Sequence, residues 1–463
     1  MPLTRAAFAV LLATTAVTTG VQAETISEQP YPGTIVLKVD ASNTAQQIFR
    51  VRQTIPAQPG KLTLLYPQWV VANHGPSGAL NQFAGLKASA NGKPLDWRRD
   101  PLNVWAFTVD VPAGANAVDI EFQYLSPVEA SQGRTTFTND ILGVQWQSLA
   151  IYPAGYRSRN ITIQPNLTVP PGWQFGTALE TAARNGDEIA FKPLDFETFL
   201  DSPLFAGRYF RRIDLDPGAK IPVHLNVVAD SPEQLEATPE QIAPHRALIQ
   251  QSYKLFNSKH YKHYDFLFAI SDEFGGIGRE HHQSSENGVK SGYFTDWNKW
   301  EARRELLPHE FAHSWNGKFR RPAGQDVPNF NTPLDNSLLW VYEGQTQYWG
   351  AVLAARSGRV RRPPRQRAWP HLARGAGHHV RSDHQRAPPA SVEQLAARRG
   401  LLPGRPADLA GRRHQDPRAV RRQALARRRR ARLLRRRRRR PCRQALHLRR
   451  RGGRAERGAA VRL

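Results

Sequence analysis

An α+β multidomain fold is predicted by two features of this 463-residue chain. From residue 24 to about residue 230, apolar and polar side chains alternate with period two between turns rich in Pro, Gly and Asn, which is typical of β-strands. From about Ser231 the apolar side chains recur at helical spacing instead. We therefore expect a β-sandwich-like N-terminal domain over residues 24–232, followed by a domain of helices and strands over residues 233–358.

Residues 1–23 have the pattern of an export signal. Arg5 supplies a positive start, residues 6–17 are mostly small and apolar, and Val21-Gln22-Ala23 resembles a signal-peptidase site. The apolar run is too short for a permanent membrane anchor, and no later stretch reaches about 18 unbroken apolar residues. We expect an exported protein, periplasmic or secreted, with no stable membrane span. An apolar N-terminal helix of a folded domain is the alternative.

The first domain contains segments in which β-branched and aromatic residues alternate with polar ones. Four of these segments are predicted strands: Thr34–Val39, Ile48–Arg52, Lys61–Tyr66 and Val118–Tyr124. Asn91-Gly92 indicates a hairpin turn, since both residues tolerate positive φ. No cluster of residues suggests chemistry in this domain. His74 and His224 are expected at the surface or in structural roles rather than as metal ligands.

The second domain opens on a predicted helix. Thr238 suits the N-cap of this helix and Pro239 its first turn. Tyr264–Ile270 is a predicted strand that leads into Gly275-Gly276. Paired glycines at the end of a strand allow another backbone to approach closely, although a simple tight turn would use them too.

The stretch His309-Glu310-Phe311-Ala312-His313 points to chemistry. On a helix, histidines four residues apart lie on one face, so both imidazoles can reach one metal ion. Glu310 lies beside them, where its carboxylate can deprotonate a metal-bound water. Pro308 suits the first turn of such a helix. A pair of histidines on an ordinary helix is the alternative.

Glu343 is the candidate for a third ligand. It stands inside the apolar run Leu338–Trp349, 30 residues after His313. A buried carboxylate without a partner is very costly, and a metal would explain it. Two histidines and one carboxylate, with a fourth position open to water, form a common catalytic zinc shell. The pattern therefore predicts one Zn²⁺ ion held by His309, His313 and Glu343, with Glu310 as the general base.

Three motifs resemble those of the M61 family of glycyl aminopeptidase-like metallopeptidases, in the family's order and approximate spacing: Gly275–Ser285, Leu306–Asn316 and Trp340–Trp349. The resemblance covers most of the chain to about residue 358. It implies a thermolysin-like (gluzincin) catalytic domain behind the β-rich domain, with the same ligand set and the same general base. Family members commonly continue with a helical subdomain and a PDZ-like domain. The sequence after residue 358 has the pattern of neither domain, so the catalytic domain is expected to be incomplete at its C-terminal end.

The resemblance also implies substrate-binding residues. Glu280 and His281 belong to the family's substrate-side motif, in which a carboxylate would hold the free α-amino group of a peptide. In a peptidase, Gly275 and Gly276 would mark an edge that pairs with extended substrate by main-chain hydrogen bonds. A solvated pair of loop histidines is the alternative for the first motif.

Residues 359–463 differ sharply in composition from the rest of the chain. They contain 34 arginines and five acidic residues among 105 residues, and no Lys, Phe, Tyr, Ile, Asn, Thr or Met. The first 358 residues therefore hold 31 of the 65 basic residues and 34 of the 39 acidic ones, a net charge of −3. The formal charge of +26 is thus a property of the Arg-rich segment. With few large apolar residues, this segment is expected to be disordered.

Three interpretations of the Arg-rich segment are open. It is a solvated extension without function, a basic arm that binds nucleic acid, or an out-of-frame translation of a GC-rich gene. We favour the last, because a wrong frame in such a gene yields mainly Arg, Ala, Gly, Pro, Leu and His. Natural basic arms usually mix Lys with Arg, so no nucleic-acid partner is expected unless the segment is genuine.

The sequence therefore predicts a zinc-dependent peptidase that acts on peptide substrates. By resemblance, it releases small N-terminal residues such as Gly or Ala through metal-activated water. A non-catalytic peptide-binding protein, or an inactive truncated member of the same family, is the alternative. Cys442 is the only cysteine, so an intrachain disulfide is excluded.

Overall fold

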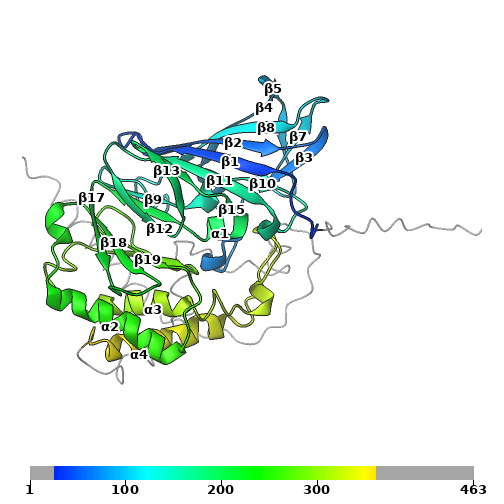
Figure 1. Cartoon of the computed structure of the whole chain (residues 1–463). Helices are drawn as coiled ribbons and strands as arrows, with labels where there is room; N and C mark the ends of the chain where they lie inside the picture. Colours follow the sequence, from blue (N-terminus) through cyan, green and yellow to red (C-terminus); the bar gives the residue numbers. More distant parts are fainter. Residues whose placement is uncertain (1–25, 361–463) are drawn as a thin grey trace, which may run out of the picture. The chain divides into compact units, whose positions relative to one another are not determined.

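The computed structural model describes residues 26–360 (Figure 1). The expected export signal, residues 1–23, lies outside the described residues, and so does the Arg-rich segment from residue 361 onward. Within the described part of the chain, no helix combines the length and the apolar character that crossing a bilayer requires.

The first region is rich in sheets, as predicted. Among the described residues, a nine-stranded sheet follows the order β13-β14-β11-β1-β2-β8-β4-β5, with β15 paired to β11. Its strands are β1 (Thr34–Asp40), β2 (Ile48–Pro56), β4 (Phe83–Ala90), β5 (Lys93–Leu95), β8 (Ala117–Leu125), β11 (Thr162–Thr168), β13 (Thr181–Asn185), β14 (Glu188–Phe191) and β15 (Leu194–Asp195). Asn91 and Gly92 join β4 to β5 with φ values of 49° and 74°, so the predicted hairpin turn is confirmed.

Two smaller sheets complete this region. One has the order β10-β3-β7-β6 and the other the order β12-β16-β9. Their strands are β10 (Tyr152–Pro153), β3 (Gly60–Leu65), β7 (Ala106–Val111), β6 (Trp97–Arg99), β12 (Gln174–Thr177), β16 (Leu204–Gly207) and β9 (Ile141–Val144). The rings of Phe83 on β4 and Phe107 on β7 lie 5.5 Å apart in one apolar core, so the large sheet and the first small sheet pack face to face. This is the expected sandwich-like arrangement.

The second region is built on a mixed five-stranded sheet of order β17-β18-β19-β21-β20. Its strands are β17 (Tyr209–Asp214), β18 (Val223–Ala229), β19 (Tyr264–Ile270), β21 (Ser284–Val289) and β20 (Gly278–Glu280). All seven residues of β19 are buried, as expected for a central strand paired in parallel on both sides. The sheet order places β20 at one edge.

This sheet begins before the expected domain boundary at residue 232. β17 pairs with β18 and β18 pairs with β19, so the boundary falls inside one structural unit. The first region ends instead near Gly207, at the end of β16. Period-two alternation marks a strand but does not show which sheet the strand joins, so the sequence pattern could not separate β17 and β18 from the strands before them.

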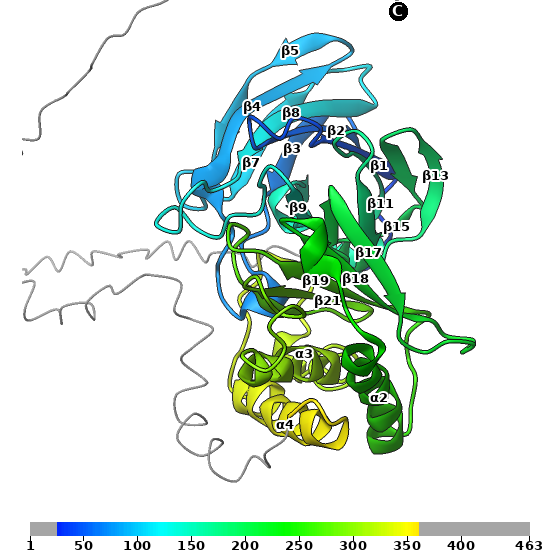
Figure 2. The same cartoon turned by 90° about the vertical axis from the view of Figure 1, so that its left-hand side faces the viewer.

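Helices cover one face of the five-stranded sheet (Figures 1 and 2). They are α2 (Pro239–Phe256), α3 (Leu306–His313) and α4 (Thr346–Arg356). The other described helical segments are short: α1 (Phe196–Leu200), η1 (Val71–Asn73), η2 (Leu80–Gln82), η3 (Trp146–Ser148), η4 (Ser158–Asn160), η5 (Pro232–Leu235), η6 (Glu301–Glu305), η7 (Ala323–Gln325) and the π-helix η8 (Trp340–Gln345).

The start of α2 follows from local chemistry. Thr238 Oγ1 accepts a hydrogen bond from the Gln241 N–H, and the Gln241 side chain accepts one from the Thr238 N–H, which forms a capping box. Pro239 occupies the first turn, so the predicted start is confirmed. The helix runs through Pro244 and ends at Phe256, and its C-cap Asn257 has a φ of 48°.

Gly350 allows α4 to pack closely against α3. A Cβ atom at this position would lie 2.9 Å from His309 Cα and 3.1 Å from His309 N. These are backbone atoms, so Gly350→Ala would force the two helices apart. We expect this substitution to lower the free energy of unfolding of the metal-free protein by about 1–3 kcal/mol in urea titrations.

Gly344→Ala is the matched control, because a Cβ there meets nothing within 4 Å. Its expected effect is between zero and a gain of about 1 kcal/mol from helix propensity. Equal unfolding midpoints for the two variants would contradict the close-packing argument.

Candidate metal centre

Two neighbouring helices bring the predicted ligands together. His309 and His313 lie one turn apart on α3, and their Nε2 atoms are 3.1 Å from each other. Glu343 lies on η8, directly before α4, and its Oε2 is 3.6 Å from His309 Nε2 and 3.5 Å from His313 Nε2. The π-helical turn is a local widening of the kind that often occurs at functional sites.

The spacing of these three atoms fits one zinc ion. Ligands about 2.0–2.1 Å from a tetrahedral zinc ion lie about 3.3–3.4 Å from one another. The three separations between the imidazole nitrogens and the carboxylate oxygen, 3.1, 3.5 and 3.6 Å, surround that value. Two imidazoles and a carboxylate are also the donor types that zinc prefers.

His313, a predicted ligand, is oriented by its second ring nitrogen. Its Nδ1 lies 3.1 Å from the main-chain oxygen of Asn316, which selects the tautomer that leaves Nε2 free to face the cluster. The Asn316 side chain in turn donates to Val341 O and to Thr346 Oγ1, each at 3.0 Å. These contacts tie the end of α3 to η8 and so connect two predicted ligands through one residue.

Glu310 is buried beside the ligands. Burial raises the pKa of Glu310 well above its usual value, and the charges of Glu280 and Glu343 raise it further although His313 opposes them. Gly278 of β20 permits this position, because a Cβ there would lie 2.4 Å from Glu310 Oε1. Gly278 was not singled out from the sequence. The signal was the third glycine of the Gly275-Gly276-Ile277-Gly278 run.

The cluster carries protons in the absence of a cation. Burial would lower the pKa of His313, but the carboxylates of Glu343, Glu280 and Glu310 raise it to about 9. Although burial opposes it, the neighbouring histidines hold the pKa of Glu343 far below its usual value. Metal ligands bind in their deprotonated forms, so a bound cation would release the proton of His313.

Glu280 lies next to this cluster, on the edge strand β20. Its Oε1 accepts a hydrogen bond of 2.6 Å from the Tyr342 hydroxyl and lies 3.7 Å from His74 Nε2. Burial and the charge of Glu280 raise the pKa of Tyr342 well above its usual value, so the hydroxyl stays protonated and donates. Donor atoms of His74, Glu280 and Glu343 all lie within 4.8 Å of one another.

His281 points away from the cluster, and it lines the cavity described below. Its Nδ1 lies 2.9 Å from Asp201 Oδ1, and its Nε2 lies 3.4 Å from Glu286 Oε2. Glu280, the last residue of β20, faces α3, while His281, the residue after the strand, joins a buried network of charges with Asp201 and Glu286.

Gly275 and Gly276, the predicted substrate edge, lie in the loop before β20. The Gly275 N–H donates to Thr135 O at 3.0 Å, and a Cβ at Gly275 would lie 2.3 Å from Arg134 Cγ. Gly276 lies in the same loop, before the edge strand begins at Gly278. Gly275 therefore allows a loop of the first region to approach closely, whereas the nearest atom to a Cβ at Gly276 is Gly288 O of β21, at 3.9 Å.

His74 belongs to the site, although it was expected at the surface or in a structural role. Its Nε2 lies 2.8 Å from Glu343 Oε1, and 7% of its side chain is exposed. No sequence pattern could have shown this, because His74 stands alone 235 residues before His309. His224 does match its expected structural role, since its Nδ1 lies 3.5 Å from Asp265 Oδ1, away from the cluster.

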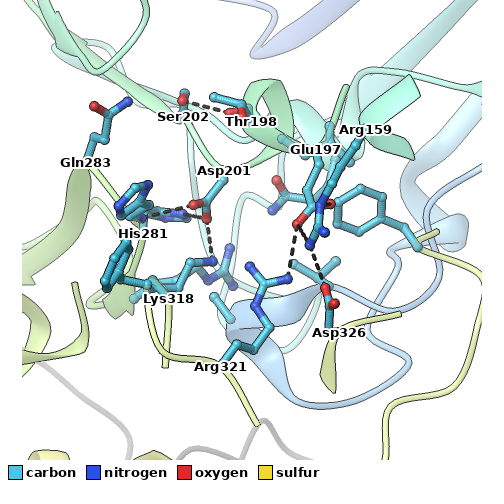
Figure 3. Close-up of a pocket in the computed structure, with 18 of the residues that line it drawn as sticks. Arg159, Glu197, Thr198, Asp201, Ser202, His281, Gln283, Lys318, Arg321 and Asp326 are labelled. Carbon is cyan, nitrogen blue, oxygen red and sulfur yellow. Dashed lines mark hydrogen bonds and ion pairs between the residues drawn. The ribbon is translucent and has the colours of Figure 1, made fainter. Parts of the chain in front are cut away.

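A separate cavity of about 550 Å³ lies between α1 and the loop that follows α3 (Figure 3). None of the three predicted ligands lines it. Its acidic side chains are already paired with basic ones: Asp201 with Lys318 and His281, Glu197 with Arg159 and Arg321, and Asp326 with Arg159. This cavity is therefore lined by charges that are already paired, and the three predicted ligands lie outside its lining.

Comparison with known proteins identifies the family. Residues 36–208 match the Peptidase M61 N-terminal domain, and residues 302–394 match the M61 glycyl aminopeptidase model, past the change in composition near Gly358. A search of curated proteins found no match.

A solved structure of the aminopeptidase N family protein from Idiomarina loihiensis is similar, with 19% identity and a TM-score of 0.60. The similarity covers 70% of this chain and 55% of that chain, so this chain spans about half the length of that relative. This likeness shows a shared fold. Because both parts of the family's architecture are matched in order, this chain belongs to the M61 peptidase family.

Proposed function

We propose that this protein is a zinc-dependent peptidase that removes small residues, such as Gly or Ala, from the free N-termini of peptides. The observation that carries the proposal is the convergence of His309, His313 and Glu343 on one point, with Glu310 beside them. Membership of the M61 peptidase family supports it.

His309, His313 and Glu343 would hold the zinc ion, which supplies Lewis-acid chemistry by polarising the scissile carbonyl and acidifying bound water. Glu310 would take the proton of the attacking water and deliver it to the departing amine. Its burial suits this role, because a carboxyl whose pKa is raised is able to give the proton back.

Glu280 would select a free N-terminus. Glu280 is 4% exposed and its carboxylate already accepts one hydrogen bond, from Tyr342, so a substrate ammonium would complete its partners. A peptide whose amino group is acetylated offers no positive charge to this carboxylate. Donor atoms of Glu280 and Glu343 lie within 4.8 Å of each other. An N-terminal ammonium held by Glu280 would therefore bring the first peptide bond to the metal ligands.

The test combines metal analysis with paired substrates. The purified chain should contain one zinc ion and hydrolyse glycyl or alanyl anilides, and chelation should abolish the activity. The N-acetylated forms of the same anilides should be cleaved far more slowly. Equal cleavage of blocked and free substrates would overturn the exopeptidase assignment, and undiminished activity after zinc removal would overturn the zinc mechanism.

Export is a separate part of the proposal. It rests on the pattern of residues 1–23 alone. N-terminal sequencing of the protein recovered from a periplasmic or culture fraction should begin at Glu24. A product that starts at residue 1 and stays in the cytoplasm would contradict it.

A further inference from the structure

His74 reaches the metal cluster from the other region of the molecule. It follows η1, which lies between β3 and β4 of the first region, whereas the predicted ligands lie on α3 and η8. Its side chain is 7% exposed, its Nε2 is 2.8 Å from Glu343 Oε1, and its ring packs edge-on against Tyr342 at 4.7 Å. Its Nδ1 has no hydrogen-bond partner among residues 26–360.

The two oxygens of Glu343 have different partners. Oε1 lies against His74 Nε2, while Oε2 faces His309 Nε2 and His313 Nε2. A carboxylate has no proton to give, so the contact with His74 requires the tautomer that carries a proton on Nε2. A donor on one oxygen fixes the rotation of the carboxylate and keeps the other oxygen aimed at the two imidazoles.

The loop that carries His74 is held in place by main-chain contacts. The N–H groups of Gln68 and Trp69 donate to Phe330 O at 3.1 and 2.6 Å, and the Asn336 side chain donates to His74 O at 2.7 Å. His74 also has a φ of 52°, which is uncommon for a residue other than glycine. These contacts hold its backbone in that conformation whatever its side chain is.

We propose that His74 is a positioning residue for the metal ligand Glu343, supplied by the N-terminal region to the catalytic region. This inference rests on the proposed function, because it assumes that Glu343 binds a metal ion. In the inferred role, His74 is not bonded to the metal. It acts through Glu343, by restricting that carboxylate to the orientation in which Oε2 completes the ligand set.

Two substitutions at one position test the inference in the full chain. His74→Leu removes the donor and keeps an apolar side chain, and His74→Gln returns an amide N–H near the position of Nε2. Both replacements are unbranched at Cβ and meet the same backbone cost. We expect His74→Leu to weaken Zn²⁺ affinity about 10- to 100-fold, the range for lost outer-shell partners, in competition titrations with a chromophoric chelator. His74→Gln should restore most of the affinity.

Co²⁺ substitution gives a readout that is independent of activity. The visible absorption of bound Co²⁺ should change in the Leu variant and return toward the original spectrum in the Gln variant. His224→Leu, which lies outside the cluster, should leave affinity and spectrum unchanged. The unfolding midpoints of the metal-free Leu and Gln variants should agree, because neither alters the main-chain contacts of the loop.

Three results would overturn the inference. Unchanged affinity in His74→Leu would remove any role for the donor, and equal losses in the Leu and Gln variants would indicate packing alone. Binding of two ions by the unaltered chain, with one lost in the Leu variant, would make His74 a ligand of a second ion with Glu280 and Glu343. If the unaltered chain binds no metal at all, the proposed function itself fails.

Discussion

Glu310→Gln is expected to lower kcat for a glycyl anilide by about 10²- to 10⁴-fold, the usual contribution of a general acid–base group. The amide keeps the size of the side chain and can still hold a water molecule, but it cannot take that water's proton. Glu310 is 2% exposed, and the three atoms that surround the proposed metal position belong to other residues. Zinc content should therefore stay at one ion per chain, and KM should change little.

Glu273→Gln is the matched control, because Glu273 is an exposed carboxylate in the loop after β19. Its kcat should equal that of the unaltered chain. Steady-state rates and zinc analysis of all three proteins would be compared at one pH. A Glu310→Gln variant that retains full activity with its zinc would refute the mechanism, whereas one that loses its zinc would show that Glu310 serves the ligand set.

Glu286→Gln is expected to destabilise the protein by about 3–5 kcal/mol, the usual cost of removing one partner from a buried ion pair. The Glu286 side chain is 1% exposed and lies between two regions. Arg134 and Gln145 approach it from the first region at 3.4 and 3.0 Å, and His281 and Arg279 from the second at 3.4 and 3.6 Å. The amide would leave Arg134, Arg279 and His281 without the negative charge of this carboxylate.

A surface ion pair provides the control. Arg52 and Glu121 are 3.1 Å apart with 77% and 50% of their side chains exposed. Pairs of this kind contribute about 0–1 kcal/mol, so Glu121→Gln should shift the urea midpoint little. Similar losses for Glu286→Gln and Glu121→Gln would mean that the buried network adds no more stability than a solvated pair.

Acid should remove the same contribution in the unaltered chain. Although burial opposes it, His281, Arg279 and Arg134 lower the pKa of Glu286 to about 2 from its usual 4.5. A carboxyl with a depressed pKa stabilises the fold fully above its unfolded value and loses that contribution as the pH falls. The stability difference between the unaltered chain and Glu286→Gln should therefore shrink as the pH falls from about pH 4.5 toward pH 2.

His281 titrates in the opposite sense. Burial would lower the pKa of His281, but its contacts with Asp201 and Glu286 raise it above the usual 6.5. A group with a raised pKa stabilises the fold fully below its unfolded value and loses that contribution as the pH rises through its folded value. The network should therefore be most stable at mildly acidic pH, where Glu286 is still charged and His281 still carries its second proton.

The parts of the site that lie on one helix were predictable from the sequence, because helical spacing converts distance along the chain into position in space. His309 and His313 are the plain case. Glu343 was predictable for a different reason, since a carboxylate inside an apolar run needs a partner. The start of α2 and the turn at Asn91 were also local matters of capping and positive φ.

The positions that the sequence did not show all depend on which element packs against which. His74 comes from a loop whose partner, residues 330–336, is more than 250 positions away. β20 ends at Glu280, and the sequence does not show that the side chains of Glu280 and His281 have different partners. Gly275 was taken as a place for a peptide, and its close neighbour is Arg134. Alternation and glycine content indicate that a surface is available, and tertiary packing decides what occupies it.

The loop that carries His74 limits how this family's architecture can be recombined. If the N-terminal region supplies a group to the metal site, it is no exchangeable module. A chimera joined near residue 208, with the N-terminal region of one relative and the peptidase region of another, would transplant part of the active centre along with the sandwich. Parents whose equivalents of this loop differ would then yield folded hybrids with altered metal retention, even though every zinc ligand came from a single parent.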